Sequence, residues 1–221
     1  MQKGYRAFIG TILCLLLGLA GCGSTGSSAG TGFLYKNLAV AEGSAVAGEG
    51  NSILFKGSPL MLSGNGIKVG DHLRDVKVAQ PDLSLVNIAH TKGEGKVRII
   101  SVVPSLDTKV CEQQTHHLSE KNKGLDKMVE LITVSIDTPF AQKRFAEEAN
   151  INNVTFLSDY RGAEFGKTYG LLLKDPHILA RAVMVVDKQN TVRYLQITPE
   201  LAQLPDMEEA FQFARSLITA S

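Results

Sequence analysis

Residues 97–111 read VRIISVVPSLDTKVC, and this stretch decides the fold. Val97 to Val103 is crowded with Val and Ile, which predicts a strand buried on both faces, and the proline after it ends the strand. Ser105 to Thr108 supplies residues that cap helices, and a helical pattern then runs from about Lys109 to Asn122. Cys111 is therefore expected in the first turn of a helix that follows a central strand.

The expected position of Cys111 favours a reactive sulfur. A helix start offers unpaired backbone N–H groups and the positive end of the helix dipole, and both favour thiolate over thiol. The alternative is a buried structural cysteine, because free cysteines are among the most buried residues. Position alone leaves both interpretations open.

Short β-type runs and helical patterns alternate along the rest of the chain. This order predicts an α/β fold with a central, mostly parallel sheet flanked by helices. An opening hairpin is expected from 53–55 and 60–62, around Gly57-Ser58-Pro59. Further strands are expected at 131–136, 154–157, 182–186 and 192–196, and further helices at 139–149, 163–169 and 207–217.

The first residues of the chain are typical of an export signal. Lys3 and Arg6 precede an apolar run, Ala7 to Ala20, that is too short to span a bilayer, so residues 1–21 are expected to be a signal peptide. The run ends in Leu-Ala-Gly-Cys22, which resembles the lipobox of bacterial lipoproteins, where cleavage precedes attachment of a lipid to the cysteine sulfur. The alternative is a plain secretory signal with an incidental cysteine.

The chain beyond the lipobox is expected to form a tether and one domain. Residues 22–50 are rich in Gly, Ser and Ala and predict a lipidated, flexible tether, and residues 51–221 predict one domain. The net charge of +1 and the absence of like-charge blocks argue against a nucleic-acid partner and against electrostatic binding to lipid. We therefore expect a membrane-anchored lipoprotein of the bacterial cell envelope, on the outer membrane or the periplasmic face if the cell is Gram-negative.

The eight residues PSLDTKVC, from Pro104 to Cys111, resemble the peroxidatic motif of the peroxiredoxins, most closely that of their thiol peroxidase subfamily. The resemblance extends over about residues 51–218. It implies a thioredoxin-like fold with an N-terminal β-hairpin extension, and commonly a homodimer. The subfamily's later landmarks are resembled, in order, by Pro139–Phe145, Val154–Ser158, Arg161–Phe165 and Leu179–Val183.

The resemblance also implies roles for individual residues. Cys111 would attack a peroxide oxygen, Thr108 would hydrogen-bond thiolate and substrate, Pro104 would shield the pocket, and Arg181 would complete it. Displacement at an O–O bond puts negative charge on the departing oxygen, which guanidinium and hydroxyl donors stabilise. Taken singly, these neighbours have ordinary explanations: a helix cap, a strand terminator and an ion-pairing arginine. Together they indicate a peroxidase that reduces hydrogen peroxide and organic hydroperoxides.

The cysteine count predicts how the peroxidase cycle ends. Cys14 leaves with the signal peptide and Cys22 takes the lipid, so Cys111 is the remaining thiol. The subfamily usually carries a resolving cysteine just beyond an Arg-Phe pair, where this chain has Ala146. We therefore expect a one-cysteine peroxidase whose sulfenic acid is reduced by an external thiol, either a thioredoxin-like protein or a small thiol.

Two other functions remain open on this sequence. A dithiol oxidoreductase needs a C-x-x-C pair, and Thr108 occupies the first place of that spacing. The stronger rival is a non-catalytic lipoprotein that uses the domain for binding or redox sensing, because the resolving thiol is missing. No cofactor or metal is expected: His116 and His117 point about 100° apart on a helix, and no further ligand completes a set.

Overall fold

The computed structural model describes residues 1, 32–91 and 95–219. Cys22 and, apart from Met1, the expected signal peptide lie outside the described residues. Contacts divide the chain into Met1–Gly32 and Phe33–Ser221, and the second unit holds every helix and strand given below. Within the part that the structure describes, no helix has both the length and the apolar character needed to cross a membrane.

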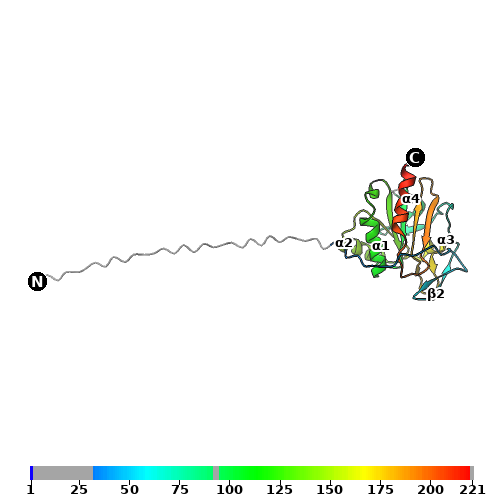
Figure 1. The fold of residues 1–221 in the computed structure, drawn as a ribbon, viewed down its shortest axis with the longest axis horizontal. Helices are drawn as coiled ribbons and strands as arrows, with labels where there is room; N and C mark the ends of the chain where they lie inside the picture. Colours follow the sequence, from blue (N-terminus) through cyan, green and yellow to red (C-terminus); the bar gives the residue numbers. More distant parts are fainter. Residues whose placement is uncertain (2–31, 92–94, 220–221) are drawn as a thin grey trace. The chain divides into compact units, whose positions relative to one another are not determined.

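A seven-stranded sheet in the order β11-β10-β5-β6-β7-β3-β4 forms the centre of the domain (Figure 1). Only the pairs β5–β6 and β6–β7 are parallel, so the sheet is mixed and the expectation of a mostly parallel sheet is wrong. The reason is that β10–β11 and β3–β4 are joined by short turns, which can connect only antiparallel strands. The strands are β3 Lys77–Ala79, β4 Leu85–Asn87, β5 Arg98–Val102, β6 Glu130–Ser135, β7 Thr155–Ser158, β10 Ala182–Val186 and β11 Val192–Ile197.

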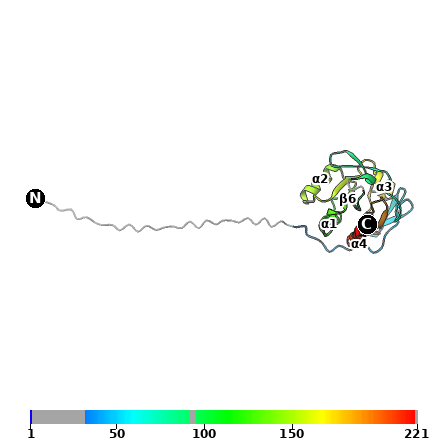
Figure 2. The same cartoon turned by 90° about the horizontal axis from the view of Figure 1, so that it is seen from above.

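Helices cover both faces of this sheet (Figure 2). On β5, Ile99 and Ile100 are both fully buried and belong to separate hydrophobic clusters, as expected for a strand covered on both faces. The cluster around Ile99 includes residues of α1, α2 and α4, whereas α3 packs into the cluster around Ile100. The helices are α1 Lys109–Glu120, α2 Pro139–Glu148, α3 Glu164–Tyr169 and α4 Met207–Thr219, with 3-10 turns at Ile88–His90 and Leu125–Lys127.

The expected N-terminal hairpin is present in a second, smaller sheet of order β1-β2-β8-β9. Its turn is Lys56-Gly57, both with positive φ, which is one residue earlier than the sequence suggested. The strands of this sheet are β1 Ser52–Phe55, β2 Ser58–Ser63, β8 Leu172–Leu173 and β9 Ile178–Leu179.

The domain begins at Phe33, so the expected boundary at residue 51 is wrong. Residues 33–50 are bonded to the domain and do not form a tether: the Ala41 N–H donates to the Leu204 carbonyl at 2.8 Å, and the Ala45 N–H to the Ile197 carbonyl at 2.8 Å. Main-chain bonds of this kind need no apolar side chains. The Gly, Ser and Ala composition of this segment therefore gave no indication of these main-chain bonds.

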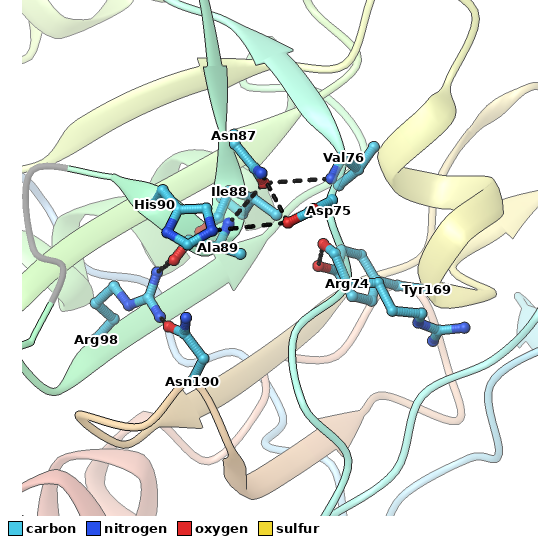
Figure 3. A network of polar contacts seen from close by, with 10 residues as sticks. All are labelled: Arg74, Asp75, Val76, Asn87, Ile88, Ala89, His90, Arg98, Tyr169 and Asn190. Carbon is cyan, nitrogen blue, oxygen red and sulfur yellow. Dashed lines mark hydrogen bonds and ion pairs between the residues drawn. The ribbon is translucent and has the colours of Figure 1, made fainter.

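A polar network at the start of β5 holds that strand in place (Figure 3). Arg98 is 1% exposed, and its guanidinium donates to the Ile88 carbonyl at 2.8 Å, to the Ala89 carbonyl and to the Asn190 side chain. These bonds tie β5 to the 3-10 turn after β4 and to the β10–β11 turn. The network lies at the opposite end of β5 from Pro104, so the strand is anchored at its start and leads to the site at its end.

Candidate active site

The loop after β5 places Cys111 at the third position of α1. Pro104 is buried in this loop, and the first main-chain bond of the helix runs from the Glu112 N–H to the Thr108 carbonyl at 2.9 Å. The preceding N–H groups, that of Cys111 included, therefore have no acceptor within the helix. Cys111 is fully buried, so its sulfur meets the positive end of the helix dipole away from bulk water.

In the described part of the chain, two side chains lie within hydrogen-bonding distance of the Cys111 sulfur. The Thr108 hydroxyl lies 2.9 Å from Sγ, and Arg181 Nη2 lies 3.4 Å from it. Thr108 precedes the helix and makes no side-chain capping bond, and its hydroxyl lies both near Sγ and 3.2 Å from the Ser105 carbonyl. The structure thus brings together Cys111, Thr108 and Arg181, as the sequence predicted, although Arg181 is 70 residues away along the chain.

Arg181 is a buried cation without a carboxylate partner. It is 2% exposed, and its other bonds go to neutral oxygens: Nε to the Leu201 carbonyl at 2.9 Å and Nη1 to Gln114 Oε1 at 2.8 Å. Among the described residues no carboxylate pairs with it. A buried charge is costly unless an opposite charge compensates it, and here the group positioned to do so is a Cys111 thiolate.

Gln114 is a functional residue that the sequence interpretation missed. It is fully buried on α1, and besides accepting from Arg181 its amide donates to Ser101 Oγ at 2.8 Å and to the Ala182 carbonyl at 3.2 Å. The available signal was its spacing, because residues three apart share a helix face and Gln114 follows Cys111 by three.

Asp137, also missed, holds the loop that carries Thr108. Its carboxylate accepts from Ser105 Oγ at 2.7 Å and from the Leu106 N–H at 2.8 Å. The signal was topological: Asp137 follows β6, the parallel neighbour of β5, and the carboxyl ends of parallel strands meet at one edge of a sheet.

Comparisons with known proteins identify the family. A family profile described as Redoxin matches residues 68–211. The thiol peroxidase of Halalkalibacterium halodurans is 44% identical over 167 residues, 76% of this chain and 99% of its own length, and that of Streptococcus pneumoniae is 40% identical over 165 residues, 75% and 99%. This chain belongs to the thiol peroxidase subfamily of the peroxiredoxins. The crystal structure of a peroxiredoxin-like protein from Aquifex aeolicus is 38% identical to this chain and matches it with a TM-score of 0.70. The match covers 79% of this chain and 99% of the Aquifex chain.

The position expected for a resolving thiol lies on α2 of the peroxidase. Ala146 packs against the hydrophobic cluster that contains Cys111 and lines an open hollow of about 440 Å³ together with Phe156 and Lys143. Within the residues that the structure describes, Cys111 is the free cysteine. The hollow therefore presents a methyl group at the position where the sequence resemblance leads us to expect a resolving sulfur.

One acidic residue of the peroxidase has a strongly shifted pKa. Burial raises the pKa of Asp159 to about 6, although the Phe165 and Gly166 N–H groups donate to its carboxylate at 2.9 and 2.8 Å and oppose the shift. Phe165 and Gly166 lie in the first turn of α3. The titration of Asp159 is therefore expected to affect the stability of α3 more than the chemistry at Cys111.

Proposed function

We propose that this thiol peroxidase reduces hydroperoxides through Cys111 by a one-cysteine mechanism at the bacterial cell envelope. The observation that carries the proposal is the pairing of a fully buried sulfur with Arg181 at 3.4 Å and Thr108 at 2.9 Å. The guanidinium has no carboxylate partner in the described chain, so the Cys111 sulfur is the group placed to take up the opposite charge during the reaction. A structural cysteine would not need a buried cation beside it.

The proposed first step is a displacement at the peroxide. The Cys111 thiolate attacks one peroxide oxygen, the O–O bond breaks, and the departing oxygen leaves as alkoxide or hydroxide and takes up a proton. Cys111 is oxidised to sulfenic acid and the peroxide is reduced to alcohol or water. As negative charge moves from sulfur to the departing oxygen, the Arg181 guanidinium and the Thr108 hydroxyl can follow it, so they stabilise the transition state. Pro104, which is buried in the loop between β5 and α1, is assigned to exclude water from the reaction centre.

The proposed second step uses an external thiol. The sequence has cysteines at 14, 22 and 111, and Ala146 occupies the resolving position, so no internal partner is available to a Cys111 sulfenic acid in the exported domain. An external thiol displaces water from it to give a mixed disulfide, and a second thiol releases the reduced enzyme and a new disulfide. A thioredoxin-like protein or a small thiol would serve.

Stopped-flow peroxide reduction with mass spectrometry tests both steps. The purified protein should consume about one equivalent of peroxide in a rapid phase and gain one oxygen at Cys111, whereas Cys111→Ser should do neither. An internal disulfide after oxidation would contradict the one-cysteine mechanism. If Cys111 shows no rapid oxidation, the domain is a non-catalytic binding or sensing module.

The envelope location is proposed from the lipobox and tested separately. Mass spectrometry of membrane-extracted protein should find acyl groups on Cys22, and Cys22→Ser should move the protein out of the membrane fraction. A wild-type chain with an unmodified Cys22 would refute the anchor. Light scattering tests the homodimer proposed from the family resemblance, and a monomer would contradict it.

A further inference from the structure

Residues 33–41, here called the strap, lie outside the part of this chain that its thiol peroxidase relatives match. The thiol peroxidase relatives match 76% of this chain but 99% of their own length, so about a quarter of this chain extends beyond them. The family profile ends at residue 211, ten residues before the end of the chain, so nearly all of that excess lies at the N-terminal side and includes the strap. In Figure 2 the strap, in blue, runs past α1 and then α4.

One end of the strap is fastened to α1, the helix that carries Cys111. Gln113, which is 2% exposed, makes two hydrogen bonds with the main chain of Lys36. Its Oε1 accepts from the Lys36 N–H at 2.8 Å, and its Nε2 donates to the Lys36 carbonyl at 2.9 Å. The Phe33 ring stacks on the His116 ring at 3.9 Å, and the Tyr35 hydroxyl donates to Glu120 at 2.7 Å. Burial and that bond raise the pKa of Tyr35, so it stays a donor.

The other end of the strap is fastened to the segment that holds Arg181. The Leu204 N–H donates to the Ala39 carbonyl at 2.9 Å, and the Ala41 N–H donates to the Leu204 carbonyl at 2.8 Å. Three residues before Leu204, the Leu201 carbonyl accepts from Arg181 Nε at 2.9 Å.

These contacts close a ring around the site. The strap holds Gln113; the next residue, Gln114, holds Arg181 at 2.8 Å; Arg181 bonds to Leu201; and the segment from Leu201 to Leu204 returns to the strap. Cys111 is carried by the α1 side of this ring, while Arg181 spans both sides. The strap therefore joins the two elements that carry the partners of Sγ and of the guanidinium.

We propose that the strap is a positioning element of the active site, which keeps the Arg181 guanidinium against Cys111 by joining α1 to the segment 201–204. The proposal rests on Cys111 being the reacting thiol, as proposed above. Gln113 is then a positioning residue that acts through Gln114 and Arg181, and it touches no reacting atom.

A double-mutant cycle in the full chain tests this proposal. Gln113→Ala removes both bonds to Lys36 and should lower the second-order rate of Cys111 oxidation about tenfold. In an Arg181→Met background, the same substitution should change the remaining rate less than about twofold, because its effect passes through the guanidinium. An equal factor in both backgrounds would overturn the proposal, since a general loss of structure is additive.

Asn153→Ala provides a matched control. Asn153 also fastens α1 by two bonds, accepting from Ser119 Oγ at 2.7 Å and donating to the Ser119 carbonyl at 2.9 Å. It donates in addition to Asp126 at 3.2 Å, but no bond joins it to the described residues of the strap or to Arg181. It should lower thermal stability as Gln113→Ala does and leave the oxidation rate within about twofold. A rate loss equal to that of Gln113→Ala would count against the proposal.

Tyr35→Phe tests the strap without removing a buried side chain. It deletes only the bond to Glu120 and should slow oxidation by about threefold. A wild-type rate in both Tyr35→Phe and Gln113→Ala would refute the positioning role. Cys111→Ser separates the two proposals. If this variant keeps the peroxidase rate, Cys111 is not the reacting thiol. If Cys111→Ser is inactive and Gln113→Ala is fully active, only the positioning role of the strap is refuted.

Discussion

Thr108→Val removes the hydroxyl beside Sγ in the proposed reaction centre, together with its 3.2 Å contact to the Ser105 carbonyl. Valine has nearly the shape of threonine but lacks the hydroxyl that lies 2.9 Å from Sγ. A hydrogen bond to a charged group contributes about 1.5–3 kcal/mol, and each 1.4 kcal/mol corresponds to about a tenfold change in rate. Thr108 is exposed, so water will replace part of the lost bond. The rate of peroxide reduction should fall by about tenfold, the lower end of that range.

The assay is single-turnover oxidation of Cys111, followed by stopped flow under excess peroxide. Thr108 makes no capping bond, but its hydroxyl also contacts the Ser105 carbonyl at 3.2 Å, so the free energy of unfolding in urea should fall by about 1 kcal/mol or less. Thr108→Ser keeps the hydroxyl and should retain a rate within about threefold of the parent. If Thr108→Val reacts as fast as the parent, the hydroxyl does not stabilise the transition state and the assigned role is wrong.

Gln114→Leu leaves Arg181 Nη1 without its acceptor, so the substitution should lower the free energy of unfolding by about 1–3 kcal/mol and slow peroxide reduction at least about tenfold. Urea denaturation measures the first effect and stopped flow the second. An unchanged rate would contradict the role given to Gln114. Burial raises the pKa of Asp159 from 3.8 to about 6, so its protonation stabilises the fold fully below pH 3.8 and this contribution is lost as the pH rises through about 6. Between about pH 5 and pH 7 the parent should lose about 1 kcal/mol that Asp159→Asn does not lose, and parallel stability curves would refute the shift. Gly170→Ala should destabilise the fold by about 2 kcal/mol or more, because φ is +66° and a Cβ would lie 2.4 Å from the Gly48 nitrogen; an unchanged melting temperature would show that the close approach can relax.

The local pattern around Cys111 could be predicted because it depends on neighbours in sequence. The run of Val and Ile before Pro104 predicted β5, and the structure buries Ile99 and Ile100 on opposite faces. The helical pattern after Thr108 predicted α1 to within about two residues. Both follow from local patterns of apolar residues, which involve only a few neighbouring residues or one or two turns of helix.

Features that depend on long-range contacts were missed or came only from the family resemblance. Nothing in the spacing of Arg181 shows that it reaches Sγ from 70 residues away. The strap was read as part of a tether because average composition does not record main-chain bonds such as those between Ala41 and Leu204. The prediction of a mostly parallel sheet was wrong for a similar reason, because strand direction depends on which strands the short turns join.

The buried charge of Arg181 weighs against the rival function, a binding or sensing domain without chemistry. Such a domain would have to keep a guanidinium that is 2% exposed and that, among the residues the structure describes, is bonded beyond Cys111 to the neutral oxygens of Gln114 and Leu201. An uncompensated buried charge costs about 3–5 kcal/mol, a large part of the stability of a domain of this size. In the proposed mechanism the compensating anion forms on the Cys111 sulfur, which lies 3.4 Å from the guanidinium. A domain without that chemistry would gain stability by replacing Arg181 with an apolar residue.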